Sequence, residues 1–79
     1  MGMDREAEVR RLNEADGHVA TGERHVTEQQ LIVDKLRAEG RDTQEAKRLL
    51  KMMQDSLDAY REHRQLILEM IAQIDAGLA

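Results

Sequence analysis

Proline and cysteine are both absent from the sequence. Because proline is the residue that stops a helix outright, its absence leaves glycine and capping residues as the signals that can end one. Without cysteine the chain can form neither a disulfide framework nor a thiolate metal site, which fits a reducing compartment. No apolar run reaches the length of about 18 residues that a membrane span needs, so the sequence predicts a soluble, cytoplasmic chain.

Aromatic residues and basic charge are scarce as well. Tyr60 is the only aromatic residue besides the histidines, so the stacking platforms that single-stranded nucleic acids use are lacking. Sixteen acidic side chains against twelve basic ones give a formal net charge of -4, whereas nucleic acids and anionic membranes select a net basic face. We therefore expect neither a nucleic acid nor a membrane as a partner.

Helical patterning has one clear interruption, between Glu39 and Thr43. Gly40 stands where a left-handed C-terminal cap residue is wanted, and Asp42 and Glu45 have the spacing of a capping box, with Thr43 as the alternative N-cap. The expected fold is all-α: one domain over residues 1–79 that forms an antiparallel hairpin of two long helices. The predicted boundaries are a first helix over about 4–38, a turn over about 39–42 and a second helix over about 43–76.

The first helix carries one narrow apolar stripe, in alternating steps of three and four residues. Four of its members are seven residues apart, which is the heptad spacing of a helix–helix seam. Because the side chains are small, this helix can cover only a narrow face of a partner. The stripe consists of Leu12, Ala15, Val19, Gly22, Val26, Gln29, Val33 and Leu36.

The second helix is apolar around much more of its circumference. Its predicted seam consists of Ala46, Leu49, Met53, Ser56, Tyr60, His63, Ile67, Met70 and Ile74. A further stripe lies beside this seam, formed by Leu50, Leu57 and Ile71, and Met52 and Leu66 flank its other side. The first helix is too narrow to cover all of these side chains.

This apolar surplus predicts self-association. A chain of this size rarely gains more than about 3–5 kcal/mol from its own core, and burial of apolar surface contributes about 25 cal/mol per Å². A second copy of the chain is the simplest partner that could cover the surplus apolar side chains. We therefore expect a homodimer in the form of a four-helix bundle or coiled coil, with an unknown protein as another potential partner. The predicted interface consists of Leu49, Met53, Leu57, Tyr60, Leu66, Ile67, Met70, Ile71 and Ile74.

A resemblance extends over about residues 12–70. It is carried by Gly22-Glu23-Arg24-His25-Val26, Gln29, Leu31, Leu36, Gly40, Asp42-Thr43, Ala46, Leu49-Leu50, His63-Arg64 and Ile67-Leu68. In these positions the chain resembles short, uncharacterised helical proteins of alphaproteobacteria, especially those of the rhizobial group. The resemblance implies a bacterial lineage and a helical fold, and it implies no activity.

Three histidines are the residues most like metal ligands. His18 and His25 share a helix face but lie about 10 Å apart along the axis, which is too far for one ion to bridge. None of the histidines follows a glutamate at the Glu-x-x-His spacing of carboxylate di-metal bundles. We therefore expect no metal site and no cofactor, and interpret His18, His25 and His63 as residues that border the seam.

One segment offers an alternative function. The segment Gln54–Asp58 is similar to the Ser-Gln-Glu-Leu-Asp-like segment of sporulation-type aspartyl-phosphate phosphatases, which are helical hairpins. Leu57 and Asp58 match that pattern, whereas Gln54 replaces its leading serine. The expected function is a non-catalytic protein–protein interaction or structural module, because no catalytic motif is present and a two-helix hairpin has no deep cavity. The alternative is a regulator of a phosphorylated signalling protein that acts through Asp58.

Gly22 is the position with the sharpest packing prediction. Glycine inside a helix is unfavourable by about 1 kcal/mol relative to alanine, so it should have a packing reason. In a hairpin centred near Arg41, Gly22 lies opposite Tyr60. We therefore expect Gly22 to form a notch that receives Tyr60.

Overall fold

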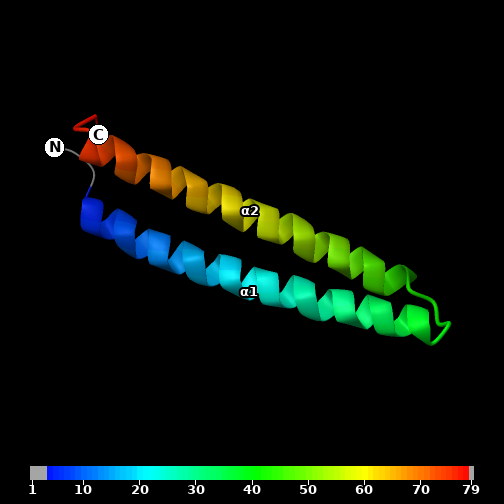
Figure 1. Ribbon diagram of the computed structural model, residues 1–79. Coiled ribbons are helices and arrows are strands. Elements are labelled where there is room, and N and C mark those ends of the chain that lie inside the picture. The colour runs from blue at the N-terminus through cyan, green and yellow to red at the C-terminus, as the bar shows by residue number, and fades with distance from the viewer. Residues whose placement is uncertain (1–3, 79) are drawn as a thin grey trace.

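The computed structural model describes residues 4–78 of the chain. Helix α1 spans Arg5–Ala38 and helix α2 spans Gln44–Asp75, and the two run antiparallel, side by side, over their whole length (Figure 1). The hairpin measures 60 × 14 × 13 Å between its outermost Cα positions. Among the described residues there is no strand, so the expected all-α hairpin is confirmed, with helix ends at most one residue from those predicted.

The turn forms because α1 ends in a Schellman motif. Gly40 has a φ of 68°, a left-handed conformation that glycine adopts without steric cost. The Gly40 N–H donates to the Arg37 carbonyl at 3.1 Å, and the Arg41 N–H donates to the Leu36 carbonyl at 2.9 Å. These two bonds satisfy carbonyls that the helix itself leaves free, and they confirm Gly40 as the residue that ends α1.

The start of α2 is capped by one half of the predicted capping box. The Asp42 carboxylate accepts a hydrogen bond from the Gln44 backbone N–H at 2.9 Å. The Glu45 carboxylate, the other half, accepts instead from the Arg48 guanidinium at 2.7 Å. Thr43 occupies the N-cap position without a side-chain hydrogen bond, and Asp42, one residue earlier, satisfies the first N–H of α2 in its place. Glu45 forms an ion pair with Arg48 one turn further along α2.

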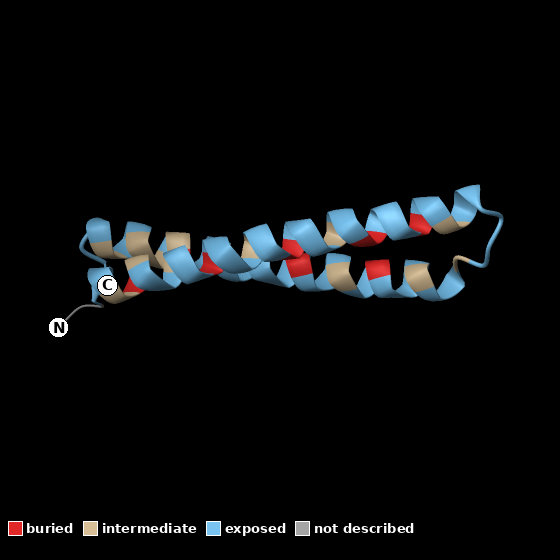
Figure 2. Cartoon of the chain, turned by 90° about the horizontal axis from the view of Figure 1, so that it is seen from below, coloured by how far each residue is buried: buried red, intermediate tan, exposed pale blue. Residues whose placement is uncertain are grey.

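The seam of α1 is confirmed, and one residue extends it. Its buried residues are Glu8, Ala15, Gly22, Gln29 and Val33, of which the first four are seven residues apart. Figure 2 shows the buried residues as isolated patches on the facing sides of the two helices. The core is thus one narrow row of side chains between α1 and α2.

The predicted seam of α2 is right in part, because Ile67 is buried and Ala46, Met53 and Ile74 are half-buried, but the contact with α1 is rotated by part of a turn. Leu50 and Leu57 are buried against α1, whereas Leu49, Ser56 and His63, which we expected in the seam, are exposed. The physical reason lies in α1. Gly22 leaves a gap that a leucine side chain fills well, and this draws the Leu50–Leu57 edge of the apolar surface onto α1.

Gly22 does form a notch, but its main occupant differs from the one expected. A Cβ atom placed on Gly22 would lie 3.1 Å from Leu57 Cδ1 and 3.6 Å from Tyr60 Cδ2. Leu57 therefore fills the notch, and Tyr60 lies at its edge at an ordinary contact distance. The hairpin register explains the difference, because Leu57 lies nearly one turn closer to the tip of the hairpin than Tyr60.

Two alanine substitutions test this notch. A Cβ on Gly17 would meet no atom of the described chain within 4 Å beyond its immediate helical surroundings, so Gly17→Ala should stabilise the protein by about 1 kcal/mol through helix propensity. At Gly22 the same gain is opposed by the contact with Leu57, which is buried and cannot move away freely. We expect Gly22→Ala to be less stable than Gly17→Ala by about 1 kcal/mol or more in urea unfolding followed by circular dichroism. Equal gains from the two variants would show that the notch is not tightly filled.

A polar contact fixes the pairing of the helices near the turn. The Gln29 side-chain amide donates a hydrogen bond to the Ala46 carbonyl of α2 at 3.0 Å, and Gln29 is buried. A buried polar residue with a single available acceptor penalises shifted pairings of the two helices, because a shift would leave the amide unsatisfied.

At the open end, Arg5 donates to Asp75 at 2.7 Å, and this bond lowers the pKa of the Asp75 carboxyl group.

Candidate interaction surface

The two broad sides of the hairpin differ in chemistry. On one side, which we call the groove face, apolar side chains of α2 run alongside two histidines of α1. Met52 and Leu66 are its most exposed large side chains, at 60% and 63%. The groove face comprises His18, His25, Leu49, Met52, Met53, Ser56, Tyr60, His63, Leu66 and Met70.

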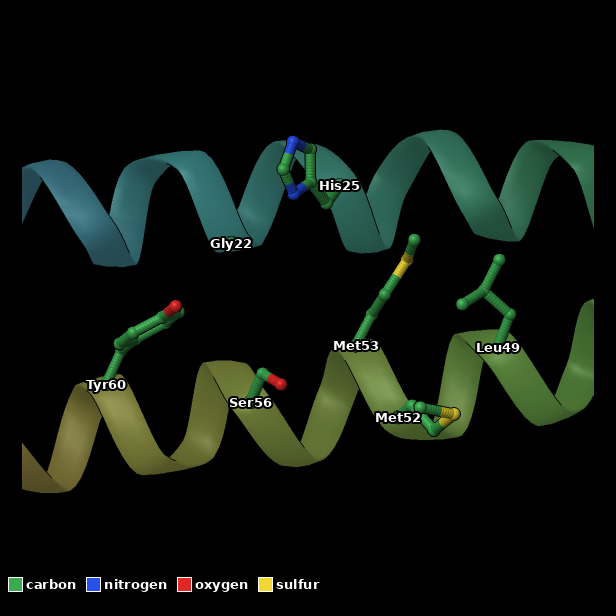
Figure 3. Close-up of a pocket in the computed structure, with 7 residues that line it drawn as sticks. All are labelled: Gly22, His25, Leu49, Met52, Met53, Ser56 and Tyr60. Carbon is green, nitrogen blue, oxygen red and sulfur yellow. The ribbon is translucent and has the colours of Figure 1, made fainter.

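The middle of the groove face is a shallow depression of about 280 Å³ between the helices. Gly22 and His25 line it from α1, and the other lining residues belong to α2. In Figure 3, Tyr60 and Met53 point from α2 toward α1, while Met52 lies along its own helix. The His18 ring stacks on the Tyr60 ring, with 5.3 Å between centroids and 16° between planes. The walls of the depression are therefore thioether, aliphatic and aromatic groups.

The groove continues from this depression toward both ends of the hairpin. Toward the turn, Leu49 and Met52 also line a hollow with Ala46. Toward the termini, Leu66 and Met70 line another hollow, at the three- and four-residue steps that keep them on the same face of α2. The groove face is thus one strip that extends along most of α2.

Glu8 lies beside the terminal hollow, and its burial is not expected from the sequence. Its side chain is buried, yet its carboxylate accepts a 2.5 Å hydrogen bond from Arg11. Its charge suits the first turn of α1, where it complements the positive end of the helix dipole. Its heptad spacing to Ala15 and Gly22 is the signal that places it in the seam.

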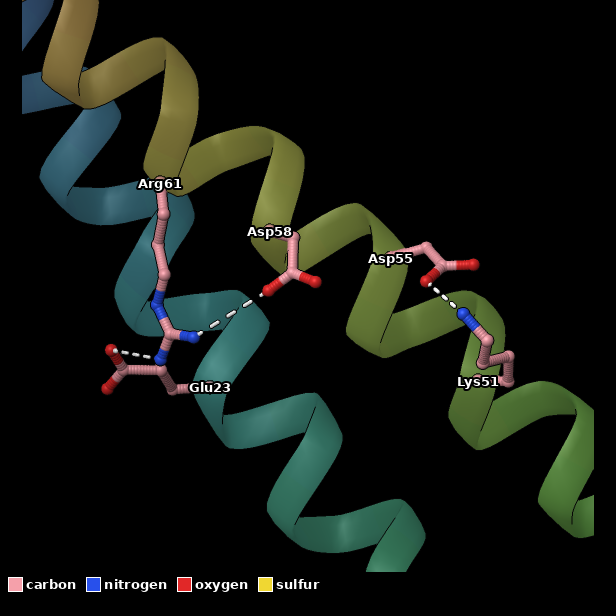
Figure 4. A network of polar contacts seen from close by, with 5 residues as sticks. All are labelled: Glu23, Lys51, Asp55, Asp58 and Arg61. Carbon is pink, nitrogen blue, oxygen red and sulfur yellow. Dashed lines mark hydrogen bonds and ion pairs between the residues drawn. The ribbon is translucent and has the colours of Figure 1, made fainter.

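The opposite side of the hairpin, which we call the charged face, is covered by ion pairs within the chain. Arg61 reaches Glu23 of α1 at 3.5 Å and Asp58 of α2 at 3.9 Å, and Lys51 pairs with Asp55 at 2.6 Å (Figure 4). The hydrogen bond from Lys51 to Asp55 raises the pKa of the lysine. Such exposed pairs contribute little to stability, but they give this face a hydrated, polar character.

The predicted interface residues are divided between the core and the surface. Leu57 and Ile67 are buried between α1 and α2 within one chain. Leu49, Tyr60 and Leu66 are exposed on the groove face. The remaining members are half-buried along its inner edge: Met53, Met70, Ile71 and Ile74. Met52, which we had placed only on a flank, is among the most exposed apolar residues of this face.

The segment that suggested a phosphatase is dispersed around α2. Leu57 is in the core and Ser56 lines the groove. Asp55 and Asp58 are on the charged face, where each lies within 4 Å of a basic side chain. The carboxylate of Asp58 is therefore part of an ion-pair cluster, and the serine and the carboxylates of this segment do not converge on one site.

Metal ligation and membrane insertion find no support in the part of the chain that the structure describes. Between residues 4 and 78, no three side chains of histidine, cysteine, aspartate or glutamate are arranged to hold an ion. Over the same residues, neither helix combines the length and the hydropathy that crossing a bilayer demands. His18, His25 and His63 border the groove, and the His18 ring packs on Tyr60.

No family model, curated protein or solved structure matches this chain. Function is therefore inferred from the two faces of the hairpin.

Proposed function

We propose that this chain is a non-catalytic, cytoplasmic protein–protein interaction module that self-associates through its groove face. The observation that carries the proposal is the exposure of Met52 and Leu66, at 60% and 63%, on one mostly apolar face of α2. Large apolar side chains that gather on one face mark an interaction site, whereas isolated ones do not. A second hairpin that covers this strip would complete a four-helix bundle.

The small core of the single hairpin supports self-association. Among the described residues, the buried hydrophobic side chains are Ala15, Val33, Leu50, Leu57 and Ile67. Two packed helices form one layer, and the apolar arc of α2 is wider than one neighbouring helix can cover. Pairing of two layers would bury the groove-face residues of both chains and supply the core that each chain lacks.

The dimensions of the groove face suit a stable dimer. One whole side of the hairpin, its polar half included, has an area of roughly 840 Å² from the Cα extents of 60 Å by 14 Å. This is close to the ~800 Å² per partner that standard protein–protein interfaces bury. A contact along the whole hairpin is therefore large enough to hold two chains together.

The chemistry of the two faces supports a non-catalytic role. The groove contains aliphatic, thioether and stacked aromatic groups, which bind partners by burial rather than by bond making. The carboxylates of Asp16, Glu23, Asp55 and Asp58 each pair with an arginine or a lysine of the same chain, and a shallow, open groove does not exclude water as catalysis requires.

Light scattering coupled to size-exclusion chromatography tests the proposal. At micromolar concentration we expect a molar mass twice that of one chain, and dilution should shift it toward the single-chain mass. Circular dichroism of the same samples should show a predominantly helical protein. A stable helical monomer at tens of micromolar would contradict the proposed function.

A further inference from the structure

The apolar arc of α2 is not centred on α1. At about 100° per residue, its apolar side chains cover about 150° of the helix, from the edge that holds Leu50 and Leu57 to the edge that holds Met52 and Leu66. Helix α1 covers the first edge and the neighbouring position of Ile67, and it leaves the second edge exposed. The middle of the arc therefore points about 50° away from α1, out of the plane of the hairpin and toward the groove face.

Helix α1 contributes a different chemistry to the same side of the hairpin. The exposed positions of α1 next to the groove are polar, namely Arg11, Glu14, His18, Thr21, His25 and Glu28, except for Ile32 near the turn, which is 48% exposed. The groove face is thus divided lengthwise into an apolar half, formed by α2, and a polar half, formed by α1. Any partner that covers this face must match both halves at once.

Two copies can meet face to face about two kinds of two-fold axis. An axis along the hairpin would bring both turns to the same end and set α2 of one chain on α1 of the other. An axis across the hairpin would bring the turns to opposite ends and set α2 on α2 and α1 on α1. The first arrangement places Met52 and Leu66 against the polar half of the partner, where charged groups such as Glu14 and Glu28 would lose water without gaining partners of matching polarity. The second places the apolar half on the apolar half.

The order of side chains along α2 also suits the second arrangement. Leu49 and Met52 lie toward the turn, Leu66 and Met70 lie toward the termini, and Ser56, Ala59 and His63 lie between them, with Tyr60 next to the midpoint. Reversal of this strip about its midpoint, near Ala59, sets large apolar groups on large apolar groups. The same reversal brings Ser56 of one chain to the level of His63 of the other, where hydroxyl and imidazole can form a hydrogen bond.

We infer that two hairpins pair across a two-fold axis near Ala59, with α2 packed antiparallel on α2 of a second copy and the turns at opposite ends. The inference rests on the proposed self-association and adds the partner's orientation. It makes α2 the inner contact of the assembly and leaves the charged faces outside.

Distances between two spin labels test the orientation. Because the chain has no cysteine, a single cysteine introduced by Arg41→Cys or Ala59→Cys carries the only label in each protomer. Arg41 is exposed in the turn, so a label there should not disturb the contact. Light scattering on the labelled samples confirms that each variant has kept the mass of the unlabelled protein.

The inferred pairing predicts opposite results at the two positions. Neighbouring helices pack about 10 Å apart, so labels at residue 59 should lie within roughly 20 Å of each other. Labels at residue 41 should be separated by nearly the 60 Å length of the hairpin. Short distances at both positions would overturn the inferred orientation while leaving self-association intact. A wild-type monomer by light scattering, with no dipolar coupling at either position, would overturn both the inference and the proposed function.

Discussion

Leu66→Glu is expected to convert the self-associated protein into a helical monomer, whereas Leu31→Glu should leave its mass unchanged. Both leucines are 63% exposed in the single hairpin, so a glutamate at either position is tolerated by the fold of one chain. Leu66 lies on the groove face, while Leu31 lies on the side of α1 that points away from α2 and the groove. The pair of variants therefore separates the effect of position from the effect of adding charge.

The expected effect of Leu66→Glu is large because a two-fold contact contains the side chain twice. Full burial of one leucine contributes about 1.5–3 kcal/mol, and 63% of each Leu66 remains to be buried in the dimer. The loss per dimer is therefore about 2–4 kcal/mol, before the cost of desolvating two carboxylates. With a factor of ten per 1.4 kcal/mol, the dissociation constant should rise by at least roughly 25-fold in sedimentation equilibrium. Equal dissociation constants for Leu66→Glu and Leu31→Glu would remove the groove face from the interface.

Leu57→Ala is expected to destabilise the hairpin itself, by about 2–5 kcal/mol. Leu57 is buried and fills the gap over Gly22, and the narrow core has few other side chains that could close the resulting cavity. The midpoint of urea unfolding, measured by circular dichroism, should fall at every protein concentration. Leu31→Ala is the matched control and should shift the midpoint little, since its side chain is mostly in water.

A second substitution distinguishes lost packing from a general disturbance of α2. Adding Gly22→Ala to Leu57→Ala places a methyl group in the space that the leucine vacates. The double variant should therefore be more stable than the sum of the two single effects predicts, by an interaction energy of about 0.5–3 kcal/mol. Strict additivity would mean that Gly22 and Leu57 are not packed on each other.

The sequence was sufficient to predict the helices and their ends. Gly40 and Asp42 act through local geometry and local hydrogen bonds, so their effect is readable without knowledge of the rest of the chain. The α1 seam was also predictable, because a narrow stripe leaves only one face to bury. Glu8 was missed because its charge received more weight than its spacing.

The orientation of α2 could not be predicted in the same way. When a helix has a wide apolar arc, the sequence periodicity predicts that the middle of the arc contacts the neighbouring helix, here α1. The actual contact depends on fit at one point, where Leu57 fits over Gly22 better than Tyr60 does. The division of predicted interface residues between core and surface follows from this rotation, and it is why Leu57 is buried while Leu49 and Leu66 are exposed.

The ion pairs opposite the groove have a consequence for the size of the assembly. In the proposed dimer the apolar strips of both chains are buried in one two-fold interface. The outer surfaces of the dimer carry the hydrated ion pairs of Arg61 and Lys51. Two chains of formal charge -4 give the pair a charge of -8, so like-charged dimers repel one another. Growth into sheets or fibres would need a second large apolar surface, whereas this side of the hairpin carries ion pairs around a shallow hollow lined by Val26 and Leu57. The assembly should therefore be finite, with two chains as its natural limit.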